Sequence, residues 1–324
     1  MKKLVTIAAS LFLALSLISC GKKIDSSTWL SDFDDAKKAA QTEDKKIFLF
    51  FSGDDYDGVS SSLKEKIFNT EDFIKKYTEK FVLVNLDFSQ EKYDNDQETS
   101  LKNIRVFNKY NASGIPYFLI LSKEGYIITK LALASDVALD SIHVVFDEAA
   151  DEITKFDEEI AKIYTGTKEE KLATINNFLK NTDQETVALL RPLNELYISL
   201  DKKRETPEYK SHLIAITYAK AQDYLMDNNV DMACKEFEDL SKNKALDDGD
   251  RQIALYTAGY VLAQSGSDDK QKIYDYLQKA YDIAPESEEA QQIKIALTQV
   301  KMMIDGEGDI PAQEMGPAEK PAAN

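Results

Sequence analysis

The spacing of apolar residues changes once along this chain, near Leu139, and this change limits the folds that the chain can adopt. Before it, short apolar or alternating runs at residues 47–51, 81–88, 117–121 and 126–131 are separated by helical segments. Such short runs, bounded by turn residues, are typical of strands. After it, apolar residues recur every three to four positions up to about residue 304, which indicates helices. The sequence therefore predicts an α/β domain followed by an all-helical domain.

The N-terminus has the pattern of a bacterial export signal. Lys2 and Lys3 precede an uncharged apolar stretch at residues 4–18, which is shorter than the roughly 20 residues that a membrane-spanning helix needs. The segment 17–20 (LISC) resembles the lipobox of bacterial lipoproteins. That resemblance implies a signal peptide at 1–19, lipid on Cys20 and a lipidated linker at 20–27.

The charge balance excludes two classes of partner. The chain carries 57 Asp and Glu against 40 Lys and Arg, a formal net charge of −17. A surplus of acids repels phosphate backbones and anionic headgroups, so we expect no nucleic acid partner and no direct attraction to a membrane surface. The expected membrane contact is the lipid on Cys20. The predicted location is the bacterial cell envelope, facing the periplasm or the exterior, with inner and outer membrane both open.

Cysteine usage limits the redox chemistry. The chain has two cysteines, Cys20 and Cys234, so lipidation of the first leaves no intramolecular disulfide. A lone thiol in an exported protein is more often a buried apolar side chain than a reactive group, and we expect this of Cys234.

The first half predicts an ordered series of elements. An amphipathic helix covers 29–40, and the strand at 47–51 is followed by a loop at 52–59. Helical segments at 60–68 and 69–77, the second strand, a polar insertion at 89–99 interpreted as a surface loop, and a helix at 101–110 follow in that order. Pro116 then leads into a hairpin that turns at residues 123–125.

This order resembles the thioredoxin family, and three stretches carry the resemblance. Residues 50–60 (FFSGDDYDGVS) match the active-site stretch, 81–87 (FVLVNLD) the second central strand, and 110–117 (YNASGIPY) the cis-proline loop. The resemblance implies a thioredoxin-like domain at 28–150, with a central mixed sheet flanked by helices.

The chain departs from this family at its reactive residues. Asp57 and Ser60 occupy the two cysteine positions within the degenerate stretch of Tyr56, Asp57, Gly58, Val59 and Ser60. A carboxylate and a hydroxyl cannot form a mixed disulfide, so we expect a redox-inactive domain with no catalytic residue.

The peptide-binding part of such a site can survive the loss of its thiols. Backbone beside the proline is free to pair with an extended peptide, so Ile115, Pro116 and Tyr117 are the candidate peptide-binding residues. The alternative is that Pro116 only shapes the hairpin.

The acids near the first strand also suggest a cation site. With Gly58 as the sixth residue of a Ca²⁺ loop, Gly53 would be the first and Lys64 the twelfth, where Asp and Glu are required. Because both ends fail, we interpret the acids as a solvated loop or as caps of the next helix. His143 and His212 lack metal-ligand spacing, so neither metal nor cofactor is predicted.

The second half resembles tetratricopeptide repeats. Small and aromatic residues fall at that family's spacings in two copies, at 221–240 and 259–285, with a degenerate pair before them at 172–197. The resemblance implies a peptide-binding array at 151–304, and the alternative is a plain helical bundle. The Gly- and Pro-rich segment 305–324 is predicted to be disordered.

These features favour a membrane-tethered lipoprotein that acts as a protein- or peptide-binding scaffold or a chaperone-like adaptor. Two alternatives stay open: a thioredoxin-class enzyme that works without its own thiols, and a cation- or ligand-binding lipoprotein.

Overall fold

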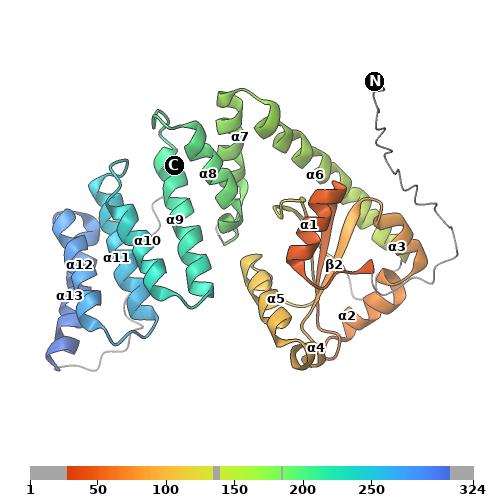
Figure 1. Cartoon of the computed structure of the whole chain (residues 1–324), viewed down its shortest axis with the longest axis horizontal. Helices are drawn as coiled ribbons and strands as arrows, with labels where there is room; N and C mark the ends of the chain where they lie inside the picture. The colour runs from red at the N-terminus through yellow and green to blue at the C-terminus, as the bar shows by residue number, and fades with distance from the viewer. Residues whose placement is uncertain (1–27, 134–138, 184, 307–324) are drawn as a thin grey trace, which may run out of the picture.

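The structure is a computed structural model that describes residues 28–133, 139–183 and 185–306. It contains a sheet domain and a helical region, joined by the long helix α6 (Leu139–Thr165) (Figure 1). The predicted signal peptide, Cys20, the linker 20–27 and most of the predicted tail lie outside the described residues.

The sheet has four strands in the order β2-β1-β3-β4. Their bounds are β1 (Lys46–Ser52), β2 (Phe81–Asp87), β3 (Tyr117–Leu121) and β4 (Ile127–Leu131). β1 runs parallel to β2 and antiparallel to β3, and β3 runs antiparallel to β4. The sheet is therefore mixed, as the sequence predicted.

Alternating side chains of β1 fill two separate cores, one on each face of the sheet. Ile47, Leu49 and Phe51 pack with residues of α1 (Phe33–Glu43) and α5 (Gln97–Lys109). Phe48 and Phe50 pack on the other face, against α2 (Gly58–Leu63), the π-helix at Lys64–Phe68, α3 (Glu71–Tyr77) and α6. Both faces of β1 are buried, which explains its continuous apolar run.

The prediction of a surface loop at 89–99 is wrong, because this segment is mostly helical. α4 (Gln90–Asn95) begins after Ser89, whose hydroxyl accepts a hydrogen bond from the Lys92 N–H. α5 begins after Asp96, whose carboxylate accepts from the Thr99 N–H. Two side-chain caps start two short helices here, although the segment has few apolar residues.

The helical region follows from α6 to α13, and each helix packs against the next one in sequence. Figure 1 shows these helices as successive layers extending away from the sheet domain. The bounds after α6 are α7 (Lys168–Asn181), a 3₁₀ helix at Val187–Leu190 (η3), α8 (Arg191–Leu200), α9 (Tyr209–Met226), α10 (Val230–Ser241), α11 (Asp248–Gln264), α12 (Lys270–Ile283) and α13 (Glu288–Asp305).

Close approach of α11 and α12 depends on a glycine. A Cβ on Gly259 would lie 3.3 Å from side-chain atoms of Tyr276 and Leu277, closer than ordinary van der Waals contact.

Within the described ranges, no helix combines the length and apolar character needed to cross a bilayer.

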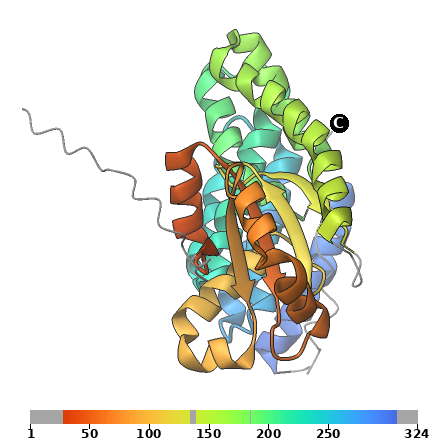
Figure 2. The same cartoon turned by 90° about the vertical axis from the view of Figure 1, so that its right-hand side faces the viewer.

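The two parts of the chain share a core along α6. Phe156 and Ile163 of α6 pack with Tyr126 beside β4 and with Leu172 of α7 and Leu193 of α8. The predicted boundary at residue 150 lies inside α6, which runs unbroken alongside the sheet domain (Figure 2). The helical region is thus attached to the sheet domain through apolar contacts at this side.

Candidate functional site

Strand register brings the predicted site residues to one end of the sheet. Ser52, the last residue of β1, pairs with Asp87, the last residue of β2. Phe51 pairs with Tyr117, the first residue of β3. The stretch containing residues 56–60 follows β1 directly, and Ile115 and Pro116 precede β3 directly. The two predicted groups therefore lie at the same end of the sheet.

Asp57 and Ser60 contact each other at the start of α2. Asp57 is the N-cap residue, and its carboxylate accepts hydrogen bonds from the backbone N–H of Val59 at 3.3 Å and of Ser60 at 2.9 Å. The Ser60 hydroxyl donates to the same carboxylate and accepts a 3.4 Å hydrogen bond from the Gly53 N–H. Ser60 is fully buried, so its hydroxyl is not available to a substrate.

Tyr56 is the exposed aromatic group at this end of the sheet. Its side chain is 62% exposed, and its ring lies so close over Gly53 that a Cβ there would collide with it. Partial burial and the negative charges of Asp55, Asp87 and Asp57 raise the pKa of the Tyr56 hydroxyl. The surface around Tyr56 is thus electronegative, and Gly58 beside it is also exposed.

Asp87 connects the end of β2 to the loop after β1. Its carboxylate accepts hydrogen bonds from the Asp54 N–H at 3.1 Å, the Ser89 N–H at 3.0 Å and the Ser89 hydroxyl at 2.9 Å. The sequence predicts Asp87 only as the last residue of a strand. Its burial and three donors make it a positioning residue for this loop.

The proline loop presents unpaired backbone at the same end. The Ile115–Pro116 peptide bond is cis, and Ile115, Pro116 and Tyr117 are each half-buried. Within the part of the chain that the structure describes, the N–H groups of Ser113, Gly114 and Ile115 make no hydrogen bond. Ser113 and Gly114 are exposed, so their N–H groups can donate hydrogen bonds to a partner.

The helical region reaches this loop from the side. The ammonium of Lys130 in β4 lies 3.6 Å from the Asp183 carboxylate after α7. Burial lowers the pKa of Lys130, but the interactions with Tyr117 and Asp183 outweigh this and raise it. The Asn111 amide also donates to Glu185. Spacing in the sequence gives no sign of these contacts, because they join segments far apart in the chain.

The histidines and Cys234 lie away from this site. His143 Nδ1 is 2.8 Å from the Tyr77 hydroxyl, and His212 is fully buried between α7, α8 and α9. Cys234 is buried in the helical core, as predicted, and burial raises the pKa of its thiol to about 11. It is the sole cysteine of the described residues. Across the same residues, no group of three or more His, Cys, Asp or Glu side chains is placed to hold a metal.

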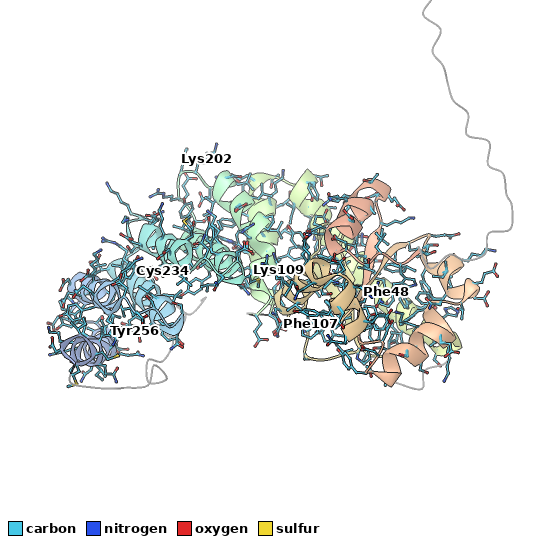
Figure 3. All side chains as sticks on the ribbon, turned by 60° about the horizontal axis from the view of Figure 1, so that its bottom comes forward. Phe48, Phe107, Lys109, Lys202, Cys234 and Tyr256 are labelled. Carbon is cyan, nitrogen blue, oxygen red and sulfur yellow. The ribbon has the colours of Figure 1, made fainter. Side chains whose placement is uncertain are left out.

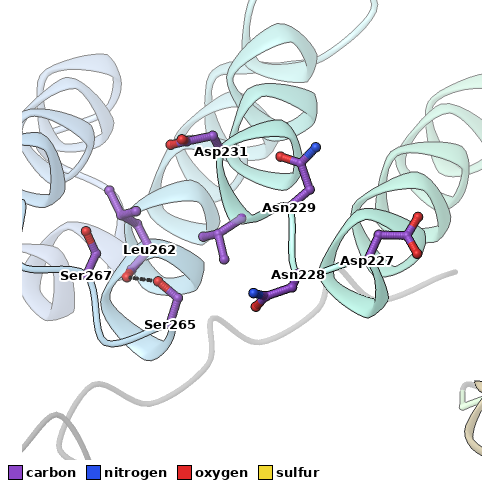
Figure 4. A pocket seen from close by; sticks show the side chains of 8 residues that line it. Asp227, Asn228, Asn229, Asp231, Leu262, Ser265 and Ser267 are labelled. Carbon is purple, nitrogen blue, oxygen red and sulfur yellow. Dashed lines mark hydrogen bonds between the residues drawn. The ribbon is translucent and has the colours of Figure 1, made fainter. Parts of the chain in front are cut away.

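A hollow of about 490 Å³ lies between two turns of the helical region, α9–α10 and α11–α12 (Figure 4). The Ser265 hydroxyl in it donates to the Leu262 carbonyl at 2.7 Å. Asp231 pairs with Lys272 at 2.7 Å. These polar groups have partners within the helical region, so the hollow adds nothing to the site at the sheet.

Comparison with sequence families assigns the first domain. Residues 33–132 match a family described as "Thioredoxin-like domain". These residues form a thioredoxin-like domain. It has no Cys-x-x-Cys pair, and an all-helical region follows it, so the predicted fold class is confirmed. Residues 208–306 match a second family, described as "Uncharacterised protein C-terminal domain".

Individual relatives match different shares of this chain. An "Uncharacterized protein" of Treponema pallidum (strain Nichols) is 20% identical over 261 residues, covering 79% of this chain and 84% of that protein. "Thioredoxin-related protein DsbJ" of Chlamydia pneumoniae is 24% identical over 126 residues, covering 38% of this chain and 36% of that protein. A solved structure described as "DsbH Oxidoreductase" is 18% identical and has a TM-score of 0.34, covering 40% of this chain and 92% of that chain.

Proposed function

We propose that this protein is a peptide- or protein-binding scaffold, or chaperone-like adaptor, built on a thioredoxin-like domain that has lost thiol exchange. Its expected location is the bacterial cell envelope, where lipid on Cys20 would tether it to a membrane.

The hydrogen bond between Ser60 and Asp57 carries the first half of this proposal. Thiol–disulfide exchange needs an attacking thiolate and a second thiol to resolve the mixed disulfide. At the positions where the resemblance places these thiols, a carboxylate caps a helix and a buried hydroxyl is bonded to that carboxylate. Cys234 cannot substitute, because it is buried and its raised pKa keeps it a thiol at neutral pH. Among the described residues, no thiol is therefore available to begin thiol–disulfide exchange.

The backbone of the proline loop supports the second half. An extended peptide can pair with exposed, unpaired backbone through main-chain hydrogen bonds. Nearby pockets that bind particular side chains of the peptide then determine its specificity. The unpaired N–H groups of Ser113 to Ile115 offer such positions, and Tyr56 supplies an exposed aromatic surface at the same end of the sheet. We propose Ile115, Pro116 and Tyr117 as the centre of this contact.

The helical region supplies a second surface. From α6 to α13 each helix packs against the next one in sequence, as consecutive units do in repeat proteins. We propose that this region is a tetratricopeptide-like array and that it binds part of the same partner.

Photocrosslinking in cells tests this proposal. A photoreactive residue replaces Tyr117 at the proline loop or Tyr224 on α9, and a matched variant carries it at Tyr164, which is 63% exposed at the end of α6. We expect defined protein adducts from position 117 or 224 that are absent from position 164. Equal adducts from all three positions, or none from the first two, would contradict the proposal.

A further inference from the structure

A cleft of about 580 Å³ separates the thioredoxin-like domain from the helical region, on the side of the sheet that α1 and α5 cover. This size falls within the range of small-molecule sites, and such sites are common where two domains meet. The cleft is distinct from the end of the sheet where the proline loop lies. Its apolar lining includes Phe33, Val106, Leu189, Pro192 and Met226.

Five cationic and four acidic side chains line the cleft, so cations outnumber acids there although the chain as a whole is strongly acidic. Three of them come from one face of α5, where Lys102, Arg105 and Lys109 are spaced by three and four residues. Lys37 reaches the cleft from α1 and Arg191 from α8. Figure 3 shows Lys109 on the side of the thioredoxin-like domain that faces the helical region. Cations therefore converge on the cleft from three separate elements.

These cations differ in their partners. Arg105 pairs across the cleft with Asp227, the C-cap residue of α9, at 2.7 Å, and Arg191 of α8 pairs with Asp223 of α9 within the helical region. Lys37 and Lys102 pair only with acids of their own helices, Asp34 at 3.0 Å and Glu98 at 2.9 Å. Such exposed pairs within a helix contribute only about 0.3–0.5 kcal/mol, so an anionic ligand can displace them. Lys37 and Lys102 are thus the cations available to a ligand.

We propose that this cleft binds a small amphiphilic anion, with its acidic group between Lys37 and Lys102 and its apolar part against the apolar lining. The Phe33 ring, which lies 5.2 Å from the Lys37 ammonium, forms the junction between the two parts. This site is independent of the peptide-binding role proposed above, and neither depends on the other.

Calorimetric titration of the full chain with octanoate tests the site, with octanol as a neutral probe of matching chain length. We expect saturable binding of one octanoate per chain and much weaker binding of octanol. The variant K37Q/K102Q is expected to weaken octanoate binding about tenfold, or about 1.4 kcal/mol, without changing the response to octanol. Circular dichroism and thermal unfolding check that the variant folds.

The matched control is K38Q/K301Q, which removes two lysines outside the cleft that also pair with acids of their own helices, Asp35 and Asp305. Octanoate binding to this control is expected to equal that of the unaltered chain. Three results would each overturn the proposal: no saturable octanoate binding, equal affinity for octanol, or equal weakening in the control and cleft variants.

Discussion

The buried hydroxyl of Ser60 donates its hydrogen to the carboxylate of Asp57, three residues earlier, at the start of helix α2. The resemblance to thioredoxins places the two exchanging cysteines at these same positions. A hydrogen bond thus joins the ends of a four-residue segment that a disulfide would join in an active enzyme. The helix start is retained, while the reactive chemistry is replaced by a structural contact.

Asp57 is expected to stabilise the domain through this contact. D57A removes the cap of α2 and leaves the buried Ser60 hydroxyl without its acceptor, so the free energy of unfolding is expected to fall by about 1–2 kcal/mol. Urea unfolding followed by circular dichroism measures the change. D55A is the control, because Asp55 is exposed and accepts from the Gln90 N–H outside α2. Equal stability of D57A and the unaltered chain would contradict the structural role.

His212 is expected to make the helical region sensitive to acid. It is fully buried and stacks on Tyr197 at 3.6 Å, and its Nδ1 lies 2.5 Å from the Asn194 side-chain oxygen. Its Nε2 lies 2.6 Å from the Asn176 side-chain oxygen, so both ring nitrogens contact amide side chains of neighbouring helices.

Burial lowers the pKa of His212 from 6.5 to about 4, because the charged ring is disfavoured in the interior. Because the pKa of His212 is lower in the folded chain than in the unfolded chain, the neutral ring stabilises the folded state, and this contribution is fully present above about pH 6.5. This stability is lost as the pH falls through 4, by about 3 kcal/mol in all. Urea unfolding from pH 7.5 to 3.5 measures this slope. We expect H212Q to flatten it; identical slopes for H212Q and the unaltered chain would contradict the assignment.

Ion pairs between α5 and α9 are expected to hold the interdomain cleft closed. Arg105 and Lys109 face Asp227 and Asp223 at 2.7 and 3.7 Å, whereas the core that α6 shares with α7 and α8 is apolar. Partly exposed pairs contribute about 0.2–1 kcal/mol each, so reversing charges turns a weak attraction into repulsion.

Small-angle X-ray scattering of R105E/K109E tests this, and we expect a larger radius of gyration than in the unaltered chain. Adding D227R restores opposite charges at positions 105 and 227 and is expected to return the radius toward the compact value; Asp223 is kept because it also pairs with Arg191. K242E, at an exposed lysine of the helical region, is the control. A radius that is unchanged in R105E/K109E would show that the ion pairs do not hold the cleft.

The sequence predicted the strands of the sheet well, because buried strands consist of continuous apolar residues. The runs at residues 47–51 and 117–121 are apolar because both strands are interior, and Pro116 introduces the hairpin as expected. The insertion at 89–99 was misjudged because its helices begin at the caps Ser89 and Asp96, which have little periodic apolar sequence behind them.

The site was predictable only where neighbouring residues define it. Asp57 as a helix cap follows from local sequence, since its partners Val59 and Ser60 lie two and three residues away. The contact of Arg105 with Asp227 spans 122 residues, and that of Lys130 with Asp183 joins a strand to the end of a helix. The spacing of Lys102, Arg105 and Lys109 indicates a cationic side of a helix, but the sequence does not predict which residues lie opposite it.

The central claim is that a thioredoxin-like domain has kept its fold while Asp57 and Ser60 stand in place of its thiols. Insulin reduction by the unaltered chain and by D57C/S60C, with each single variant as a control, tests it most directly. We predict background rates for the unaltered chain and the single variants. D57C/S60C is predicted to form a disulfide between positions 57 and 60 and to reduce insulin well above background, because a thiol at a helix N-terminus ionises readily. Reduction by the unaltered chain, or a folded D57C/S60C protein that forms no such disulfide, would contradict the claim.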